Sequence, residues 1–301
     1  MPRKRPTRAA RSSKKPKASQ PKRTRRASPR KPPVSEQAIQ LARRIAETLP
    51  FVNFPARTVF PKFLHWKRLE SGKDQERAQP AGDFERLRWG HVFAYAGPSC
   101  FRSNDSIGDA VSYFQPSLDT ELSGAIAPFD SGSLEEPRPK LQPWAGQSLA
   151  ERWRLLQKST VSLEGWRAEF QRWLLHCYTA PERYLDSSAD RYKAGVPDRT
   201  RPAAILQHNG PQGRERYGAG QCADRRAWTW EARFEQPVPF VRLQALHVAR
   251  DRVQEALQEV GRLKLKANLS IEVEALPPGQ DASADTLYED SGRVLRKLMG
   301  L

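Results

Sequence analysis

Cysteine is scarce in this 301-residue chain, and long apolar runs are missing. The three cysteines, Cys100, Cys177 and Cys222, are widely separated, and none belongs to a CxxC pair. An odd and sparse set of this kind argues against a disulfide framework and a zinc site, and it favours a reducing compartment. No run reaches the roughly 18 apolar residues that cross a bilayer, and the N-terminus lacks the apolar core of a signal peptide. We therefore expect a cytoplasmic protein with no membrane partner.

Acidic residues are absent from the first 34 positions, and this absence divides the chain. Residues 1–34 carry fourteen of the 51 Lys and Arg side chains and no Asp or Glu. Residues 35–301 carry the other 37 basic side chains and all 34 acidic ones, so the body is nearly neutral. Repulsion between like charges, together with the prolines, predicts a disordered basic arm that attracts nucleic acid or an acidic protein surface. The alternative is a solubilising leader or a targeting signal.

Familiar cofactor and metal motifs are missing as well. The sequence has no GxxxxGK[ST] loop, no GxGxxG after a strand, and no HExxH or Cys/His pair with metal-ligand spacing. His208 and Cys222 fall within one loop, which is too close in sequence for the dyad of a Cys/His protease. The common nucleotide-binding loops, a metal site and a cysteine protease are therefore not indicated.

Residues 35–301 are expected to form a single α+β domain. Helices are predicted at 35–49, 149–158, 163–178 and 251–264, and strands at 91–95, 110–114, 226–234, 238–248 and 269–275. Residues 51–70, with Pro55 and Pro61, are expected to be irregular, and residues 185–223 show no regular pattern. Because strands and helices follow one another without βαβ alternation, α+β is the expected class.

One helix and one strand carry the clearest periodic patterns. In the helix at 163–178, an apolar stripe of Trp166, Phe170, Trp173, Leu174 and Cys177 is typical of a buried face. In the strand at 226–234, one face holds Trp228, Trp230, Ala232 and Phe234, and the other holds Thr229, Glu231 and Arg233. The second face is either solvent-exposed, which is the simpler interpretation, or the floor of a cleft.

Two further segments favour the cleft. The strand at 91–95 ends in a Gly-Pro turn with Arg102 nearby, and Asp130 and Ser131 lie on a tight turn after a short apolar run. Strand ends, small residues and one acid are what a nicotinamide or another small ligand needs.

The ordered segments VFAYAGPSCFR, SYFQPS, PFDSG and DRRAWTWEARF with PVPF resemble divergent bacterial ADP-ribosyltransferases over residues 88–250. The resemblance implies a bent or split mixed β core with flanking helices, which holds NAD as a substrate. In that family an Arg or His of the first strand orients the dinucleotide, and a Ser, Thr or Tyr of a middle segment packs on the nicotinamide side. A Glu on a late strand engages the ribose hydroxyl and stabilises the oxocarbenium-like transition state.

The resemblance assigns roles to individual residues. Glu231 corresponds to the catalytic glutamate, so it is the implied catalytic carboxylate. The implied NAD-binding residues are His91 or Arg102 on the first strand, Tyr95 before its glycine, Tyr113 or Ser131 in the middle segment, and Thr229 beside Glu231. The implied function is ADP-ribosyl transfer from NAD, or NAD cleavage, with the basic arm attracting a polyanion.

Two other functions remain open on the sequence alone. One is a non-enzymatic nucleic-acid-associated protein, in which the arm contacts phosphates and the eight tryptophans, with neighbouring arginines, form a binding surface. The other is an inactive relative that keeps only the fold. The acceptor of a transferred group is open between protein, RNA, DNA and water.

Overall fold

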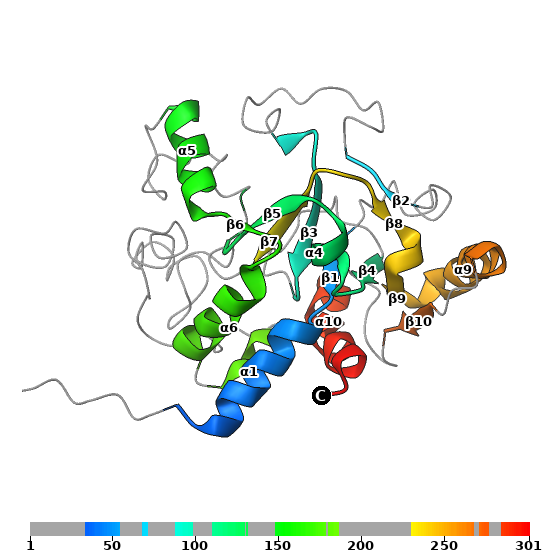
Figure 1. The fold of residues 1–301 in the computed structure, drawn as a ribbon. Helices are drawn as coiled ribbons and strands as arrows, with labels where there is room; N and C mark the ends of the chain where they lie inside the picture. The colour runs from blue at the N-terminus through cyan, green and yellow to red at the C-terminus, as the bar shows by residue number, and fades with distance from the viewer. Residues whose placement is uncertain are drawn as a thin grey trace, which may run out of the picture. The chain divides into compact units, whose positions relative to one another are not determined.

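The body of the chain is built on a mixed β-sheet of eight strands (Figure 1). The computed structural model describes residues 34–54, 68–71, 88–98, 110–129, 131, 148–178, 180–186, 230–267, 271–276 and 284–301. All of them belong to one unit, residues 34–301. The basic arm predicted at residues 1–34 lies outside the described residues apart from Val34, as does most of the patternless segment at 185–223.

The strand order of the sheet is β10-β9-β4-β1-β3-β7-β5-β6. The strands are β1 (Phe51–Asn53), β3 (Val92–Ala96), β4 (Ala110–Phe114), β5 (Gly124–Ala127), β6 (Val161–Ser162), β7 (Glu231–Phe234), β9 (Leu243–Val248) and β10 (Glu272–Ala275). Every neighbouring pair is antiparallel except β10 and β9, which are parallel. Two short strands, β2 (Arg68–Leu69) and β8 (Val238–Pro239), pair with each other separately.

Helices complete the fold, and the expected α+β class is confirmed. They are α1 (Glu36–Thr48), α4 (Leu118–Glu121), α5 (Leu149–Ser159), α6 (Trp166–Cys177), α9 (Val253–Ala267) and α10 (Ala284–Met299). Short 3-10 turns are η3 (Pro181–Leu185), η6 (Phe240–Arg242) and η7 (Arg250–Arg252). Within the described ranges, no helix is both long and apolar enough to cross a bilayer.

Two helices begin where their sequences predict. The Ser35 hydroxyl accepts a hydrogen bond from the Ala38 amide at 3.2 Å and so caps α1. Ser148 and Glu151 form a reciprocal capping box at the start of α5, in which each side chain bonds the other residue's backbone amide.

The apolar stripe of α6 packs in the core, as predicted. Trp166, Phe170, Trp173 and Leu174 are all buried; the Cys177 side chain lies outside what is described. Trp230 lies against three of these residues, with its ring centroid 5.2 Å from that of Phe170, 5.6 Å from that of Trp173 and 6.0 Å from that of Trp166. The core continues through Phe51, whose ring is 5.4 Å from that of Phe234 on β7.

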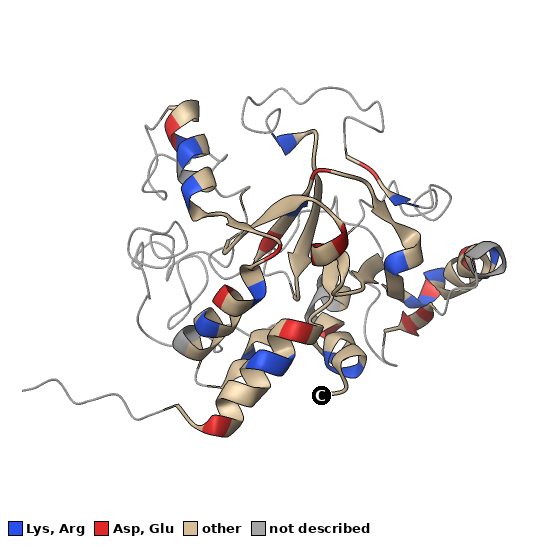
Figure 2. Cartoon of the chain, in the orientation of Figure 1, with Lys and Arg blue, Asp and Glu red and all other residues tan. Residues whose placement is uncertain are grey.

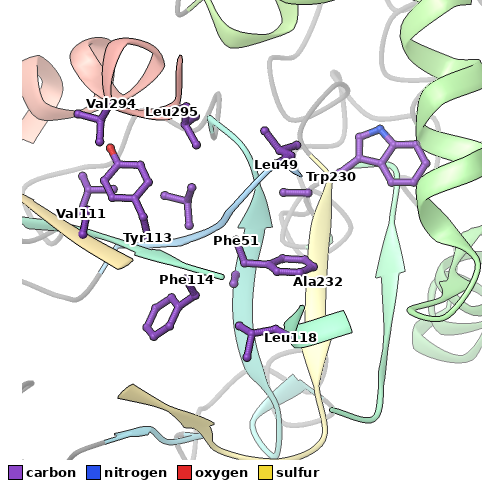
Figure 3. Close-up of a cluster of buried hydrophobic side chains, with 14 of the residues drawn as sticks. Leu49, Phe51, Val111, Tyr113, Phe114, Leu118, Trp230, Ala232, Val294 and Leu295 are labelled. Carbon is purple, nitrogen blue, oxygen red and sulfur yellow. The ribbon is translucent and has the colours of Figure 1, made fainter. Parts of the chain in front are cut away.

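A second apolar group lies beneath α10. Figure 3 shows Val111 and Tyr113 of β4 directed toward Val294 and Leu295 of that helix, and all four side chains are buried. This C-terminal helix was not among the elements expected from the sequence.

Two expectations about strands are wrong. Residues 51–53, expected to be irregular, form the central strand β1. The strand expected over 238–248 is interrupted, because it ends at Pro239, turns through η6 and resumes at Leu243. Proline has no amide hydrogen for the ladder, so strands commonly break at such a position.

Candidate active site

The site is built on β7, which has a hydrogen-bonded neighbour on each side. Tyr95 of β3 and Ala127 of β5 lie opposite Glu231, and Phe93 and Ala125 lie opposite Arg233. Residues directly opposite one another share a face of the sheet, so these six side chains form two adjacent rows on one face. The other face of β7 presents Ala232 and Phe234 to the aromatic core.

The face that carries Glu231 is partly open, although Glu231 itself is not. On β3, Phe93 and Tyr95 are half-buried, whereas Val92, Ala94 and Ala96 on the opposite face are buried. Glu231 is 0% exposed and Arg233 is 7% exposed. The interpretation of this face as solvent-exposed is therefore wrong for β7, where both charged side chains of the face are buried.

The Glu231 carboxylate is held by donors on both of its oxygens. The Ser131 backbone amide donates to Oε1 at 3.3 Å, and the Ser131 hydroxyl donates to the same oxygen. Arg88 Nη2 donates to Oε2 at 3.2 Å, and the Arg88 side chain is only 18% exposed. A carboxylate removed from water without such partners would cost several kcal/mol, so these donors explain how Glu231 can be buried.

Ser131 reaches Glu231 because β5 pairs with β7. Ala127, the last residue of β5, lies opposite Glu231, and the chain then turns so that Ser131 contacts the carboxylate. The pairing is unusually close at the other end of β5, where a Cβ on Gly124 would collide with the carbonyl oxygen of Arg233. Glycine at that position therefore permits the two strands to approach.

Arg88 was not among the residues expected at the site. It lies just before β3, and its guanidinium carbon is 4.4 Å from the centroid of the Phe93 ring. This cation–π contact places the guanidinium over the face that carries Glu231. The sequence predicted the first-strand cation at His91 or, beyond the strand, at Arg102. Arg88 is one of two arginines in the run RLRWG, and no pattern in that run distinguishes it.

The structure does not bring His91 to Glu231. Val92 pairs with Phe234, so His91 is at the other end of the β3–β7 pair, about 13 Å along the strand from Tyr95. Its Nδ1 lies 3.3 Å from the Arg88 carbonyl oxygen. Burial lowers the pKa of His91, and the Arg233 charge lowers it further, so the ring is neutral near pH 7.

The remaining predicted residues are distributed as follows. Tyr95 is in register with Glu231, and its ring centroid is 5.9 Å from that of Phe54. Tyr113 is three strands from β7, about 14 Å away, and it is fully buried beneath α10, where burial raises its pKa well above the usual value. Arg102 and Thr229 lie outside the described residues. Ser131 is thus the predicted residue that the structure places in contact with Glu231.

The buried Glu231 carboxylate is suited to stabilising positive charge that develops beside it. The part of the chain that the structure describes holds no group of three His, Cys, Asp or Glu side chains that could bind a metal ion. A fixed carboxylate that is buried from solvent interacts strongly with a cation that develops beside it, because the local dielectric is low.

No protein-family model and no curated protein sequence matches the chain. Among solved structures, the chain is similar to DarT of Thermus sp. 2.9 in complex with NAD+, with 8% identity and a TM-score of 0.38 over 75% of this chain and 95% of the other. It is also similar to the same protein in complex with ADP-ribosylated ssDNA, with 9% identity and a TM-score of 0.35 over 75% of this chain and 93% of the other.

Proposed function

We propose that the protein cleaves NAD and transfers its ADP-ribosyl group to an acceptor, with Glu231 as the catalytic carboxylate. The observation that supports this most directly is a fully buried carboxylate at the centre of a sheet, fixed by Ser131 and Arg88 on a face with half-buried aromatic residues. The order of motifs along the chain, which resembles that of bacterial ADP-ribosyltransferases, supports the same conclusion.

In the proposed reaction, Glu231 stabilises the charge that develops on the ribose. The bond between C1′ and the nicotinamide nitrogen breaks, and its electron pair leaves with nicotinamide. The lone pair of the acceptor forms the new bond to C1′, and the acceptor proton is released. Ser131 and Arg88 hold the Glu231 oxygens in place throughout, so the carboxylate does not need to reorient as the charge appears.

The proposed NAD contacts start from the residues beside Glu231. Tyr95 lies opposite Glu231 on β3 and Ser131 is bonded to it, so both border any ligand that reaches the carboxylate. Arg102 and Thr229 remain predictions from the resemblance. His91 would contact such a ligand only through its distal parts, because it is about 13 Å away by strand spacing. Tyr113 is fully buried beneath α10, about 14 Å away, and is not proposed as a contact.

The test is release of nicotinamide from labelled NAD, with Glu231→Gln as the variant and Glu235→Gln as its control. Glu235 is exposed and lies one residue beyond β7, so its substitution removes the same charge from outside the site. We expect Glu231→Gln to fold and to lose at least about 10²-fold in rate, the typical cost of removing a group that stabilises the transition state. We expect Glu235→Gln to retain the wild-type rate.

Two outcomes would contradict the proposal. One is wild-type protein that releases no nicotinamide in the presence of protein, RNA, single-stranded DNA or water as acceptor. The other is a Glu231→Gln variant with the wild-type rate. Either result would leave Glu231 as a buried structural ion-pair residue.

The structure offers little support for the non-enzymatic alternative. That interpretation needs exposed aromatic residues on which bases can stack. Among the described tryptophans, Trp166, Trp173 and Trp230 are buried, and Trp89 and Trp153 are half-buried. Contact with a polyanion is therefore proposed for the basic arm and not for these aromatic residues.

A further inference from the structure

Arg233 is a buried arginine that forms no ion pair with any of the described residues. Its side chain shares the face of β7 that carries Glu231, and its Nε has no hydrogen-bond acceptor in the described part of the chain. The described residues also supply no carboxylate within ion-pair distance of it. Arginine is almost never buried unless it is paired, because an unpaired charge loses its hydration without compensation.

The charges around Arg233 do not supply this compensation. Glu231, two residues earlier on the same face, already accepts from Arg88 and Ser131. Burial, above all, lowers the pKa of Arg233; the Arg88 charge lowers it further, and Glu231 and Glu235 act in the opposite direction. An arginine remains protonated under such conditions. Arg88 and Arg233 thus place two positive charges against the single buried negative charge of Glu231.

The geometry around Arg233 suits a planar cation that binds an anion. The Trp153 ring of α5 lies 5.7 Å from the guanidinium carbon, which orients the group by a cation–π contact. On the β5 side, Ala125 and Ala127 lie opposite Arg233 and Glu231, so the side chains there are small. The guanidinium fork donates two parallel hydrogen bonds to phosphate or carboxylate oxygens.

We infer that Arg233 binds a phosphate group of a substrate whose reacting carbon lies against Glu231. The inference rests on the proposed function, because an ADP-ribosyl donor carries a diphosphate a few bonds from the reacting C1′. The two side chains are two residues apart on one face, about 7 Å along the strand. A phosphate of a nucleic-acid acceptor would offer the same chemistry, and the experiment separates these two sources.

The first measurement is binding of inorganic pyrophosphate to the full chain, followed by calorimetry and by the shift in thermal midpoint. Arg233→Met keeps much of the apolar stem and removes the charge, and Arg262→Gln, at an exposed arginine of α9, is the matched control. We expect Arg233→Met to weaken pyrophosphate binding at least tenfold, and Arg262→Gln to leave it unchanged. We also expect Arg233→Met to unfold no earlier than the wild type without anion, because an uncompensated buried charge is removed.

The inference would be overturned if Arg233→Met had a much lower thermal midpoint than the wild type in anion-free buffer and an unchanged affinity for pyrophosphate. Arg233 would then be a packing residue. Lack of pyrophosphate binding by the wild type would overturn it as well. Neither readout needs turnover, so the inference can fail or survive independently of nicotinamide release and of Glu231→Gln.

The second measurement compares NAD with a short oligodeoxythymidylate as ligands of the wild type and of Arg233→Met. A loss confined to NAD assigns Arg233 to the donor diphosphate. A loss confined to the oligonucleotide assigns it to an acceptor phosphate. Unchanged affinity for both, together with unchanged affinity for pyrophosphate, would contradict the inference.

Discussion

Buried charged residues that are close together in this protein differ in the partners that stabilise their charges. Glu231 and Arg233 share one face of β7, yet the first accepts hydrogen bonds from Ser131 and Arg88, whereas the Nε of the second has no acceptor among the described residues and the guanidinium lies near the Trp153 ring. His247 of β9 is a third case. It is completely buried, and its Nε2 lies 3.2 Å from Asp290 Oδ2 of α10 without forming a hydrogen bond.

The environment of His247 predicts a pH dependence of stability. Burial lowers its pKa from 6.5 to about 4, outweighing Asp290 and Glu274, which raise it; Arg293 acts with burial. The unfolded chain therefore binds a proton between pH 6.5 and 4 that the folded chain does not. The contribution of His247 to the free energy of unfolding should fall across that window by up to about 3 kcal/mol and change no further below it.

The check is urea unfolding between pH 7.5 and 4 for wild type and His247→Gln. We expect the variant to show a shallower decline, since glutamine does not titrate. Parallel curves for the two proteins would mean that His247 titrates as it does in an unfolded chain.

At the scale of the helix and strand, an element with a clear sequence pattern could be predicted, whereas close packing between two elements could not. The stripe of α6 identified the helix because its apolar positions share the helical period, and the short apolar run of β4 identified a buried strand. The three residues of β1 are too few to show a period. In α10, Ser291 and Gly292 interrupt an otherwise helical pattern, yet a Cβ on Gly292 would collide with the Leu185 carbonyl oxygen of η3. The glycine is required by packing that the local sequence does not reveal.

The same distinction separates the residues of the candidate site that the sequence predicted from those that it did not. The motifs pointed to Glu231 and Ser131 because each belongs to a short segment with its own pattern. Arg88 and the burial of Arg233 depend on which strands flank β7, and a pattern within one strand cannot supply that information. Ile39 has helical spacing with Ala42, Ile45 and Leu49 in the sequence, yet it is 41% exposed whereas those three residues are buried.

The buried face of α6 leads to a prediction about stability. Trp173 is 5% exposed, and its ring lies against those of Phe170, Tyr178, Tyr184 and Trp230. Trp173→Ala should lower the free energy of unfolding by about 3–5 kcal/mol, the usual cost of truncating a buried aromatic residue.

Ile39→Ala, at an exposed apolar position, is the control and should change the free energy of unfolding by no more than about 0.5 kcal/mol. Both values come from denaturant titrations followed by tryptophan fluorescence and circular dichroism. Equal losses in the two variants would argue against the packing of the α6 stripe.

For the molecule as a whole, charge is distributed unevenly between the basic arm and the body. The positive charge is concentrated in residues 1–34, whereas α1, α5, α6 and α10 each carry side chains of both signs (Figure 2). We therefore propose that long-range attraction to polyanions comes from the arm, whereas the buried charges of β7 act over short distances.

Deletion of residues 1–34 should leave the thermal midpoint of the body unchanged and weaken binding to a polyanion such as duplex DNA or heparin. Because each neutralised phosphate contributes to the salt dependence, the plot of log affinity against log salt should also become less steep. Titrations at several salt concentrations with both proteins test this. A drop in the thermal midpoint would show instead that the arm contributes to folding.

The pairing of β7 on both sides also determines how the site can move. Backbone hydrogen bonds to β3 and β5 tie Glu231 into the interior of the sheet, where amides exchange with solvent only when much of the structure opens. The backbone that carries this carboxylate is thus fixed by its neighbours on both sides, unlike that of a hinged loop. If the proposed reaction takes place here, opening and closing around the substrate falls to the segments that surround β7, and those segments can change in evolution without disturbing the carboxylate.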